Sequence, residues 1–147
     1  MDLCTGLVNY AASVQNELYK TDNISGAWRG LIAEHITEQE IIGASNRFIE
    51  ERHFWVREAR NSQAELDFLF ISANHGIVPI EVKSGDSSRL KSLHLFMQKS
   101  PSEIAIRFWG NHESRNHIKL PSGKTFTLFN LPYYYAGFIN KYLDEKR

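Results

Sequence analysis

Three things are scarce in this 147-residue sequence, and each scarcity excludes a class of protein. Cys4 is the only cysteine, so no disulfide can form within the chain, which is typical of a reducing cytoplasm. The six histidines are scattered, without the cysteine and histidine spacing of a zinc site. No apolar run approaches the roughly 20 residues of a membrane-spanning helix, and no basic region followed by a hydrophobic one opens the chain. The sequence therefore predicts a cytoplasmic protein without a membrane span or signal peptide.

An excess of positive charge is also lacking. The 17 lysines and arginines are balanced by 17 aspartates and glutamates, whereas proteins that bind a nucleic-acid duplex usually carry a basic excess or patch. Some basic residues do gather, and they can border a phosphate track or simply form a solvated helix face: Arg47, Arg52, Arg57, Arg60, Lys83, Arg89, Lys91 and Lys99. We expect the chain alone to bind nucleic acid weakly. Its length and its 42% hydrophobic content predict one compact domain over residues 1–147.

A phosphate-binding P-loop is absent as well. That loop needs a glycine, four residues and then Gly-Lys-Ser/Thr, so that backbone amides surround the phosphates. The sequence Gly123-Lys124-Thr125 has Ile118 where the first glycine is required. Residues 121–124 are better interpreted as the turn of a hairpin over residues 117–130.

Two predicted strands carry the most informative residues. Residues 64–71 and residues 78–84 are apolar runs joined by the turn signal Asn74-His75-Gly76, which predicts a hairpin. Alternate strand residues point to one face, so Glu81 and Lys83 share a face and the hairpin brings Asp67 beside Glu81. The second strand is predicted near residues 77–83. Pro79 has no N–H for the sheet, which favours an edge or the first residues of that strand, and the conflict disappears if the regular strand starts at Ile80.

Two carboxylates and a lysine on one sheet face form a magnesium-type nuclease site. Mg²⁺ or Mn²⁺ binds carboxylate oxygens and keeps several waters, so Asp67 and Glu81 suffice as protein ligands. Such an ion polarises a phosphate and lowers the pKa of bound water. Lys83 can orient that water, take its proton or neutralise charge on the phosphate. The alternative is that these three are ordinary solvated strand residues joined by a weak ion pair.

A predicted helix precedes the strands, from Trp28 to a stop at Gly43, with Ser25 as N-cap. Trp28, Leu31, Ile32, Ile36 and Ile42 recur at roughly helical spacing and predict its buried face. Glu34 lies near the edge of that face.

The acid, the gap and the Glu-x-Lys run resemble the motif of the PD-(D/E)XK nuclease superfamily. The resemblance implies a restriction-endonuclease-like fold and a helix glutamate that leans toward the metal, which Glu34 matches, with Glu38 or Glu40 as less favoured substitutes. The catalytic set implied is Asp67, Glu81, Lys83 and Glu34, with the three acids as metal ligands.

A closer resemblance follows from several short segments in their order along the chain: 29–30, 33–35, 39–40, 54–58, 64–68 and 79–85. They are similar to the C-terminal domain, domain of unknown function 4143, of prokaryotic AAA-type ATPases. The resemblance implies a P-loop ATPase domain as an N-terminal partner, and this chain as a C-terminal part of such a protein.

The remaining predicted elements are a lead-in over residues 5–24, strands near 53–57 and 103–109, a helix over 88–99, and a closing helix from Pro132 whose tyrosines pack in a core or interface. This order predicts an α/β or α+β fold with a mixed central sheet flanked by helices.

Two functions fit the sequence. The first is a metal-dependent nuclease acting on DNA, which the intact Asp67, Glu81 and Lys83 favour. The second is a non-catalytic interaction or substrate-engaging arm of an ATPase with an inherited nuclease fold, which the neutral charge favours.

Overall fold

The computed structural model describes residues 26–44, 55–59, 62–85 and 89–145. The expected lead-in over residues 5–24, the Ser25 cap and the basic residues Arg47, Arg52 and Arg60 lie outside these ranges. None of the helices within them is long and apolar enough to cross a membrane.

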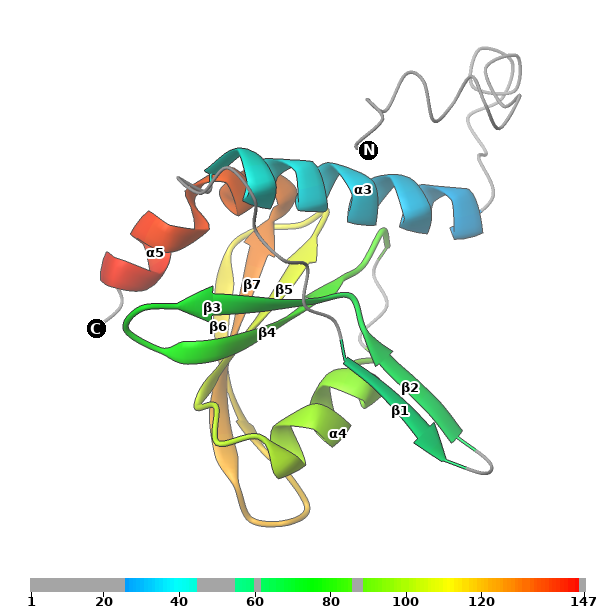
Figure 1. Cartoon of the computed structure of the whole chain (residues 1–147), viewed down its shortest axis with the longest axis vertical. Helices are drawn as coiled ribbons and strands as arrows, with labels where there is room; N and C mark the ends of the chain where they lie inside the picture. Colours follow the sequence, from blue (N-terminus) through cyan, green and yellow to red (C-terminus); the bar gives the residue numbers. More distant parts are fainter. Residues whose placement is uncertain (1–25, 45–54, 60–61, 86–88, 146–147) are drawn as a thin grey trace.

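A mixed five-stranded sheet forms the centre of the fold, in the order β3-β4-β5-β7-β6 (Figure 1). Strands β4, β5 and β7 run parallel, and β3 and β6 run antiparallel at the two edges. A separate two-stranded sheet pairs β1 with β2. The expected mixed sheet flanked by helices is thereby confirmed. The elements in chain order are α3 (Gly26–Ala44), β1 (Trp55–Ala59), β2 (Ser62–Leu66), β3 (Phe68–Ser72), β4 (Gly76–Val82), α4 (Lys91–Lys99), β5 (Ile104–Trp109), β6 (Ser114–Lys119), β7 (Thr125–Pro132), the 3-10 helix η1 (Tyr133–Phe138) and α5 (Ile139–Glu145).

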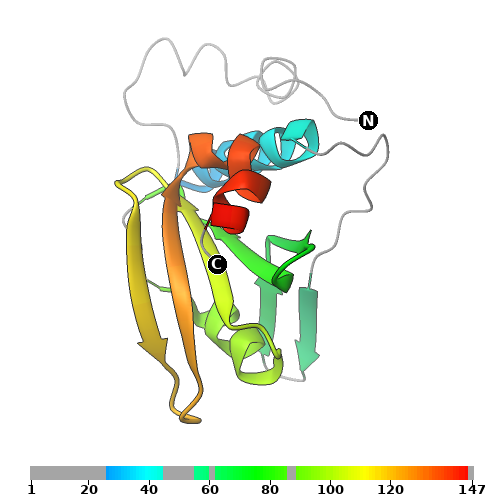
Figure 2. The ribbon, with the colours of Figure 1, turned by 90° about the vertical axis from the view of Figure 1, so that its left-hand side faces the viewer.

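Two hydrophobic cores lie on opposite faces of the central sheet, because successive strand residues alternate between faces. On β5, Ile106 and Phe108 join the first core, whereas Ala105 joins the second. The first core includes side chains from α3, η1 and α5, and the second includes side chains from α4 and β2. Figure 2 shows α3, η1 and α5 at one end of the long strands and α4 toward the other end.

The predicted helix before the strands is present as α3, but its predicted buried face is wrong. Leu31 is 55% exposed and Ile36 is 38% exposed, while Ala33 and Thr37 are buried. The reason is that α3 packs chiefly on η1, and small side chains let the two approach closely. At Gly137 of η1, an added Cβ atom would lie 2.8 Å from Glu40 Oε2 of α3. The helix also continues one residue past the predicted stop at Gly43.

The strand predicted from the apolar run 64–71 is interrupted at Asp67. Leu66, at the end of β2, is fully buried in the second core, whereas Phe68, at the start of β3, packs against the first core. The backbone therefore changes sheets between these two residues. Asp67 occupies the junction.

The second strand of the hairpin, predicted near residues 77–83, is confirmed as β4, which starts at Gly76 and includes Pro79. Pairing with β5 begins only at Ile80, opposite Ile106, and Pro79 pairs with Leu69 of the other neighbour, β3. The N–H of Val82 points toward the β3 side and that of Lys83 toward β5, so by alternation the Pro79 nitrogen faces β5 before pairing starts. No ladder hydrogen bond is lost there.

The second half of the chain follows the predicted order closely. Helix α4 ends at Lys99, before Pro101, and β6 and β7 form the predicted hairpin, with Gly123 at φ +86° in its turn. The closing helix differs, because Pro132 ends β7 and a 3-10 helix precedes α5. Of its aromatic residues, Tyr142 is buried, whereas Tyr134 and Phe138 are exposed.

Candidate functional site

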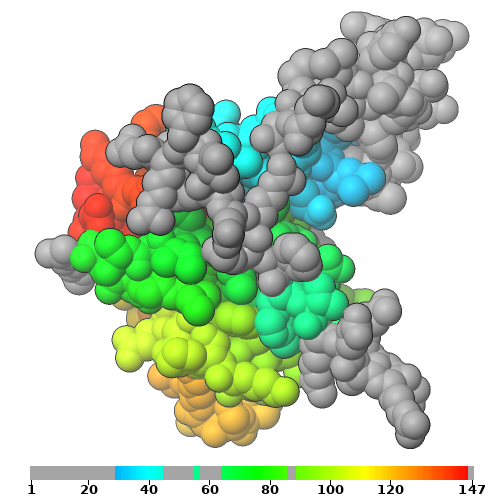
Figure 3. Space-filling model, in the orientation of Figure 1, coloured from blue at the N-terminus to red at the C-terminus, as the bar shows by residue number. Residues whose placement is uncertain are grey.

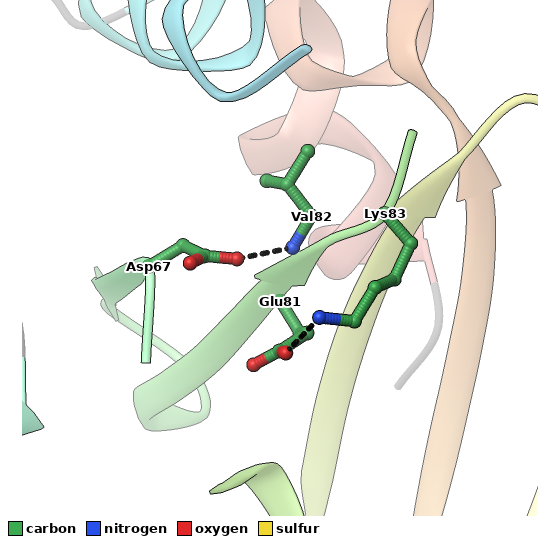
Figure 4. A network of polar contacts seen from close by, with 4 residues as sticks. All are labelled: Asp67, Glu81, Val82 and Lys83. Carbon is green, nitrogen blue, oxygen red and sulfur yellow. Dashed lines mark hydrogen bonds and ion pairs between the residues drawn. The ribbon is translucent and has the colours of Figure 1, made fainter. Parts of the chain in front are cut away.

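Asp67 lies beside the end of β4, as the hairpin predicted. The register of β3 with β4 pairs Phe68 with Ile80, which places Asp67 next to Glu81 across the two strands. Asp67 Oδ2 accepts a hydrogen bond from the Val82 backbone N–H at 2.6 Å (Figure 4). Burial raises the pKa of Asp67, while this N–H stabilises the charged form and opposes the shift. The carboxylate is thus fixed at the point where the chain changes sheets.

Glu81 and Lys83 share one face of β4, as the sequence predicted. Their side chains form an ion pair with 2.5 Å between Lys83 Nζ and Glu81 Oε1. Glu81 is only 5% exposed, and its burial raises its pKa, while the Lys83 ammonium and the Asp67 carboxylate act in opposite directions. Glu81 Oε2 is buried with no hydrogen-bond partner among the described residues. Lys83 therefore holds one oxygen of this carboxylate, and the other oxygen can accept a further hydrogen bond or bind a cation.

The backbone of Lys83 is anchored from two sides. Its N–H donates to Phe108 O of β5 at 2.9 Å, and its carbonyl oxygen accepts a hydrogen bond from the Tyr133 hydroxyl of η1. The lysine side chain thus starts from a backbone position that both the sheet and η1 determine.

Glu34 belongs to the same charged group, although it comes from α3. Its pKa is raised to about 6, chiefly by burial and next by the Asp67 carboxylate, while Lys83 lowers it. Glu65 and Glu81 raise it further. The carboxylates are near enough to disfavour each other's charge. An added Cβ atom at Gly30, one helical turn earlier, would lie 3.9 Å from Ser84 Oγ, so α3 passes close to the end of β4.

The two substitutes for Glu34 are placed differently. The Glu40 carboxylate lies beside Gly137 of η1. Asp67, Lys83 and Glu81 are all among the groups that shift the pKa of Glu34. The structure therefore brings Glu34 into electrostatic contact with the site.

Within the described ranges, no group of three or more histidine, cysteine, aspartate and glutamate residues is arranged so that it could hold a metal ion. The site therefore presents adjacent carboxylates with Lys83 on one of them. Chemically, these oxygens can accept hydrogen bonds, bind a hard cation together with water, or exchange a proton near neutral pH through Glu34.

Two further residues belong to this face of the sheet and were missed by the sequence analysis. Arg107 on β5 is opposite Glu81, and Asn130 on β7 is opposite Arg107. Both are buried. The signal available in the sequence was one polar residue inside each of two apolar runs, Arg107 within residues 104–109 and Asn130 within residues 128–132. Space-filling Figure 3 shows the β3–β4 hairpin, in green, between α3 and the segment that contains α4.

Together these features define a mixed α/β domain with paired carboxylates and a lysine at the end of its central sheet. The chain belongs to the family described as a domain of unknown function, DUF4143, which matches residues 29–134. The matched segment includes Glu34, Asp67, Glu81 and Lys83. A comparison with curated proteins finds no match to this chain.

Proposed function

We propose that this domain is a metal-dependent phosphodiesterase that acts on nucleic acid, with DNA as its substrate. The observation that carries the proposal is Glu81, a buried carboxylate whose Oε1 contacts Lys83 at 2.5 Å and whose Oε2 lacks a partner among the described residues. Asp67 lies beside it at the start of β3. The pattern of an acid followed by Glu-x-Lys resembles the motif of the PD-(D/E)XK nucleases, and this resemblance supports the same assignment.

The residues present fit a magnesium or manganese ion in their chemistry. Asp67 and Glu81 would hold it, and an ion of this kind usually completes its shell with water. Glu34 of α3 would act on that water and not as a third ligand, because the described residues form no three-ligand group. Burial raises the pKa of all three acids and the neighbouring carboxylates raise that of Glu34 and Glu81, so a cation among them would relieve repulsion. When bound, the ion would polarise the scissile phosphate and acidify a water molecule.

Lys83 and Glu34 would take the remaining roles in hydrolysis. In that reaction a water oxygen bonds to phosphorus, the phosphorus–oxygen bond to the leaving strand breaks, and the proton lost by water is balanced by one gained by the leaving oxygen. Lys83 would orient the water and stabilise negative charge on the phosphate. Glu34, with its pKa of about 6, is suited to accept the proton near neutral pH.

Metal binding is tested by thermal unfolding with millimolar Mg²⁺ or Mn²⁺. An ion at about ten times its Kd should raise the Tm of the wild-type chain by about 3–6 °C, because it binds only the folded state. Asp67→Asn should reduce this shift, since the amide can still accept the Val82 hydrogen bond but loses the charge. Glu103→Gln, an exposed acid before the opposite end of β5, is the control. Equal shifts in all three proteins would place the metal elsewhere.

Cleavage is tested with a labelled duplex or nicked DNA at low salt and with added metal. We expect slow cleavage by the wild-type chain, because a neutral protein makes few phosphate contacts and their strength falls steeply with salt. Lys83→Ala should abolish cleavage and keep a folded circular dichroism spectrum. Lys141→Ala removes the same charge from an exposed position on α5 and should cleave as wild type. Persistent cleavage by purified Lys83→Ala would exclude this role for the lysine.

The second candidate is an interaction or substrate-engaging arm of an AAA-type ATPase without cleavage. The formal net charge of zero and the lack of a three-ligand metal group among the described residues favour it. A chain extended by an N-terminal ATPase domain should cleave faster if the nuclease proposal is right. Absence of cleavage of DNA and RNA by such a protein, despite bound metal, would favour the interaction arm.

A further inference from the structure

A row of polar side chains crosses the central sheet from the candidate site. Glu81 of β4 pairs with Arg107 of β5, and Arg107 pairs with Asn130 of β7. Residues directly opposite each other project from the same face, so the three side chains are neighbours. They lie one or two residues before the carboxyl ends of three parallel strands, which is where open α/β sheets commonly bind ligands.

Unpartnered polar atoms are concentrated in this row. Four buried side-chain atoms lack a hydrogen-bond partner among the described residues, and three of them are Glu81 Oε2, Arg107 Nε and Asn130 Oδ1. Buried polar groups ordinarily have partners, so three orphaned atoms on adjacent strands indicate a missing one. The Asn130 amide nitrogen, in contrast, donates to Ser114 Oγ and Asn116 Oδ1 of β6. The deficit is therefore confined to the side of Asn130 that faces the row.

Arg107 is the unusual member of the row because its Nε is buried and has no hydrogen-bond partner among the described residues. The residue is 7% exposed, and no ion pair joins it to any residue that the structure describes. Its guanidinium carbon lies 3.9 Å from the centre of the Trp109 ring, a cation–π contact that offsets only part of the desolvation. Lys83, on the adjacent strand, already contacts Glu81. An anionic ligand would supply what Arg107 lacks.

We propose that Arg107 binds a phosphate group of a DNA strand and so positions that strand beside Asp67, Glu81 and Lys83. The planar guanidinium presents several donors in a fixed fork that matches two phosphate oxygens, which a lysine cannot reproduce. This assignment rests on the proposed function for its ligand class. It adds a strand-binding residue on β5 to a site otherwise built from β3, β4 and α3.

The test is binding of a fluorescent DNA duplex to the full 147-residue chain, measured by anisotropy over a range of salt concentrations. Divalent metal is omitted in one series and replaced by millimolar Ca²⁺ in another, and the intact length of the DNA is checked afterwards. Arg107→Gln should raise Kd about tenfold and reduce the slope of log Kd against log salt by about 0.9, the value of one lost phosphate contact. Arg107→Lys keeps the charge and should give an intermediate Kd.

Arg115→Gln is the matched control. Arg115 also lies over an aromatic ring, with its guanidinium carbon 5.5 Å from the centre of Phe129, but it is exposed and projects from the opposite face of the sheet. The substitution removes the same charge and should change Kd much less. Equal losses from Arg107→Gln and Arg115→Gln would overturn the proposal, as would the absence of any binding by the wild-type chain.

The competing arrangement is a purely structural row, with Arg107 Nε bonded to Asn130 Oδ1 directly or through water. In that case Arg107→Gln lowers Tm and leaves Kd unchanged, which overturns the proposal. If Arg107→Gln does not fold, Arg107→Lys decides, since a wild-type Kd in that folded variant would exclude recognition by the guanidinium fork. A specific loss of binding at Arg107 without cleavage by any variant would sustain this inference and remove the proposed hydrolysis. Cleavage by the wild-type chain, together with wild-type binding by Arg107→Gln, would overturn this inference and leave the proposed hydrolysis standing.

Discussion

At the scale of single residues, Glu34 connects the helix layer to the site through its charge. Its pKa in the folded chain is about 6, against an ordinary value of 4.5, because burial and the Asp67 carboxylate disfavour ionisation. Between pH 4.5 and about pH 6 the Glu34 carboxyl keeps its proton in the folded state and releases it in the unfolded state. Stability therefore falls as pH rises through this window, and the penalty is complete above pH 6.

Removing the charge of Glu34 should remove this dependence of stability on pH. We expect Glu34→Gln to raise Tm at pH 7 by a few degrees and to change Tm little at about pH 3.5, which lies below both pKa values, so that the wild-type carboxyl is largely protonated in both states. Thermal unfolding followed by circular dichroism at both pH values measures the difference. Glu103→Gln, which is exposed and remote, should show no such contrast. A Glu34→Gln effect of equal size at both pH values would mean that charge repulsion is not its cause.

At the scale of elements, the sequence predicted which segments are helix or strand better than it predicted their surroundings. The apolar run across Asp67 looked continuous, and only the packing of Leu66 and Phe68 into different cores reveals the break. In α3 the large apolar residues include Leu31 and Ile36 on the exposed side, so periodicity alone selected the wrong face. A close contact needs small residues, and small residues give no hydrophobic signal.

The orientation of α3 can be tested by exchanging side-chain size on its two faces. Ala33 is buried in the first core, so Ala33→Leu should overpack the contact and lower the free energy of unfolding by about 1–3 kcal/mol. Leu31→Gln should change it by less than about 0.5 kcal/mol, because that side chain is exposed. Urea unfolding of the two variants gives both values. A larger loss from Leu31→Gln than from Ala33→Leu would restore the face that the sequence predicted.

At the scale of the whole molecule, the candidate site was predictable only as far as local pairing reaches. Asp67, Glu81 and Lys83 follow from one hairpin and the period of a strand. Arg107 and Asn130 join them through the parallel register of β4, β5 and β7, which depends on crossovers of many residues and on the strand order. No spacing in the sequence determines that order. The same topology makes both cores share one sheet.

Because the two cores share the central sheet, we expect the chain to unfold in one cooperative transition, as a single domain. Leu143 of α5 is fully buried in the first core, and Leu93 of α4 is fully buried in the second. Leu143→Ala and Leu93→Ala should each lower the free energy of unfolding by about 2–5 kcal/mol.

Circular dichroism reports the whole fold, and tryptophan fluorescence includes Trp55, which packs edge-on against Phe96 in the second core with 5.5 Å between ring centres. The two signals should give coincident midpoints in the wild-type chain and in both variants. Leu31→Gln, exposed on α3, is the control for substitution itself. A Leu143→Ala variant whose dichroism midpoint falls while its fluorescence midpoint stays at the wild-type value would mean that the two faces of the sheet unfold independently.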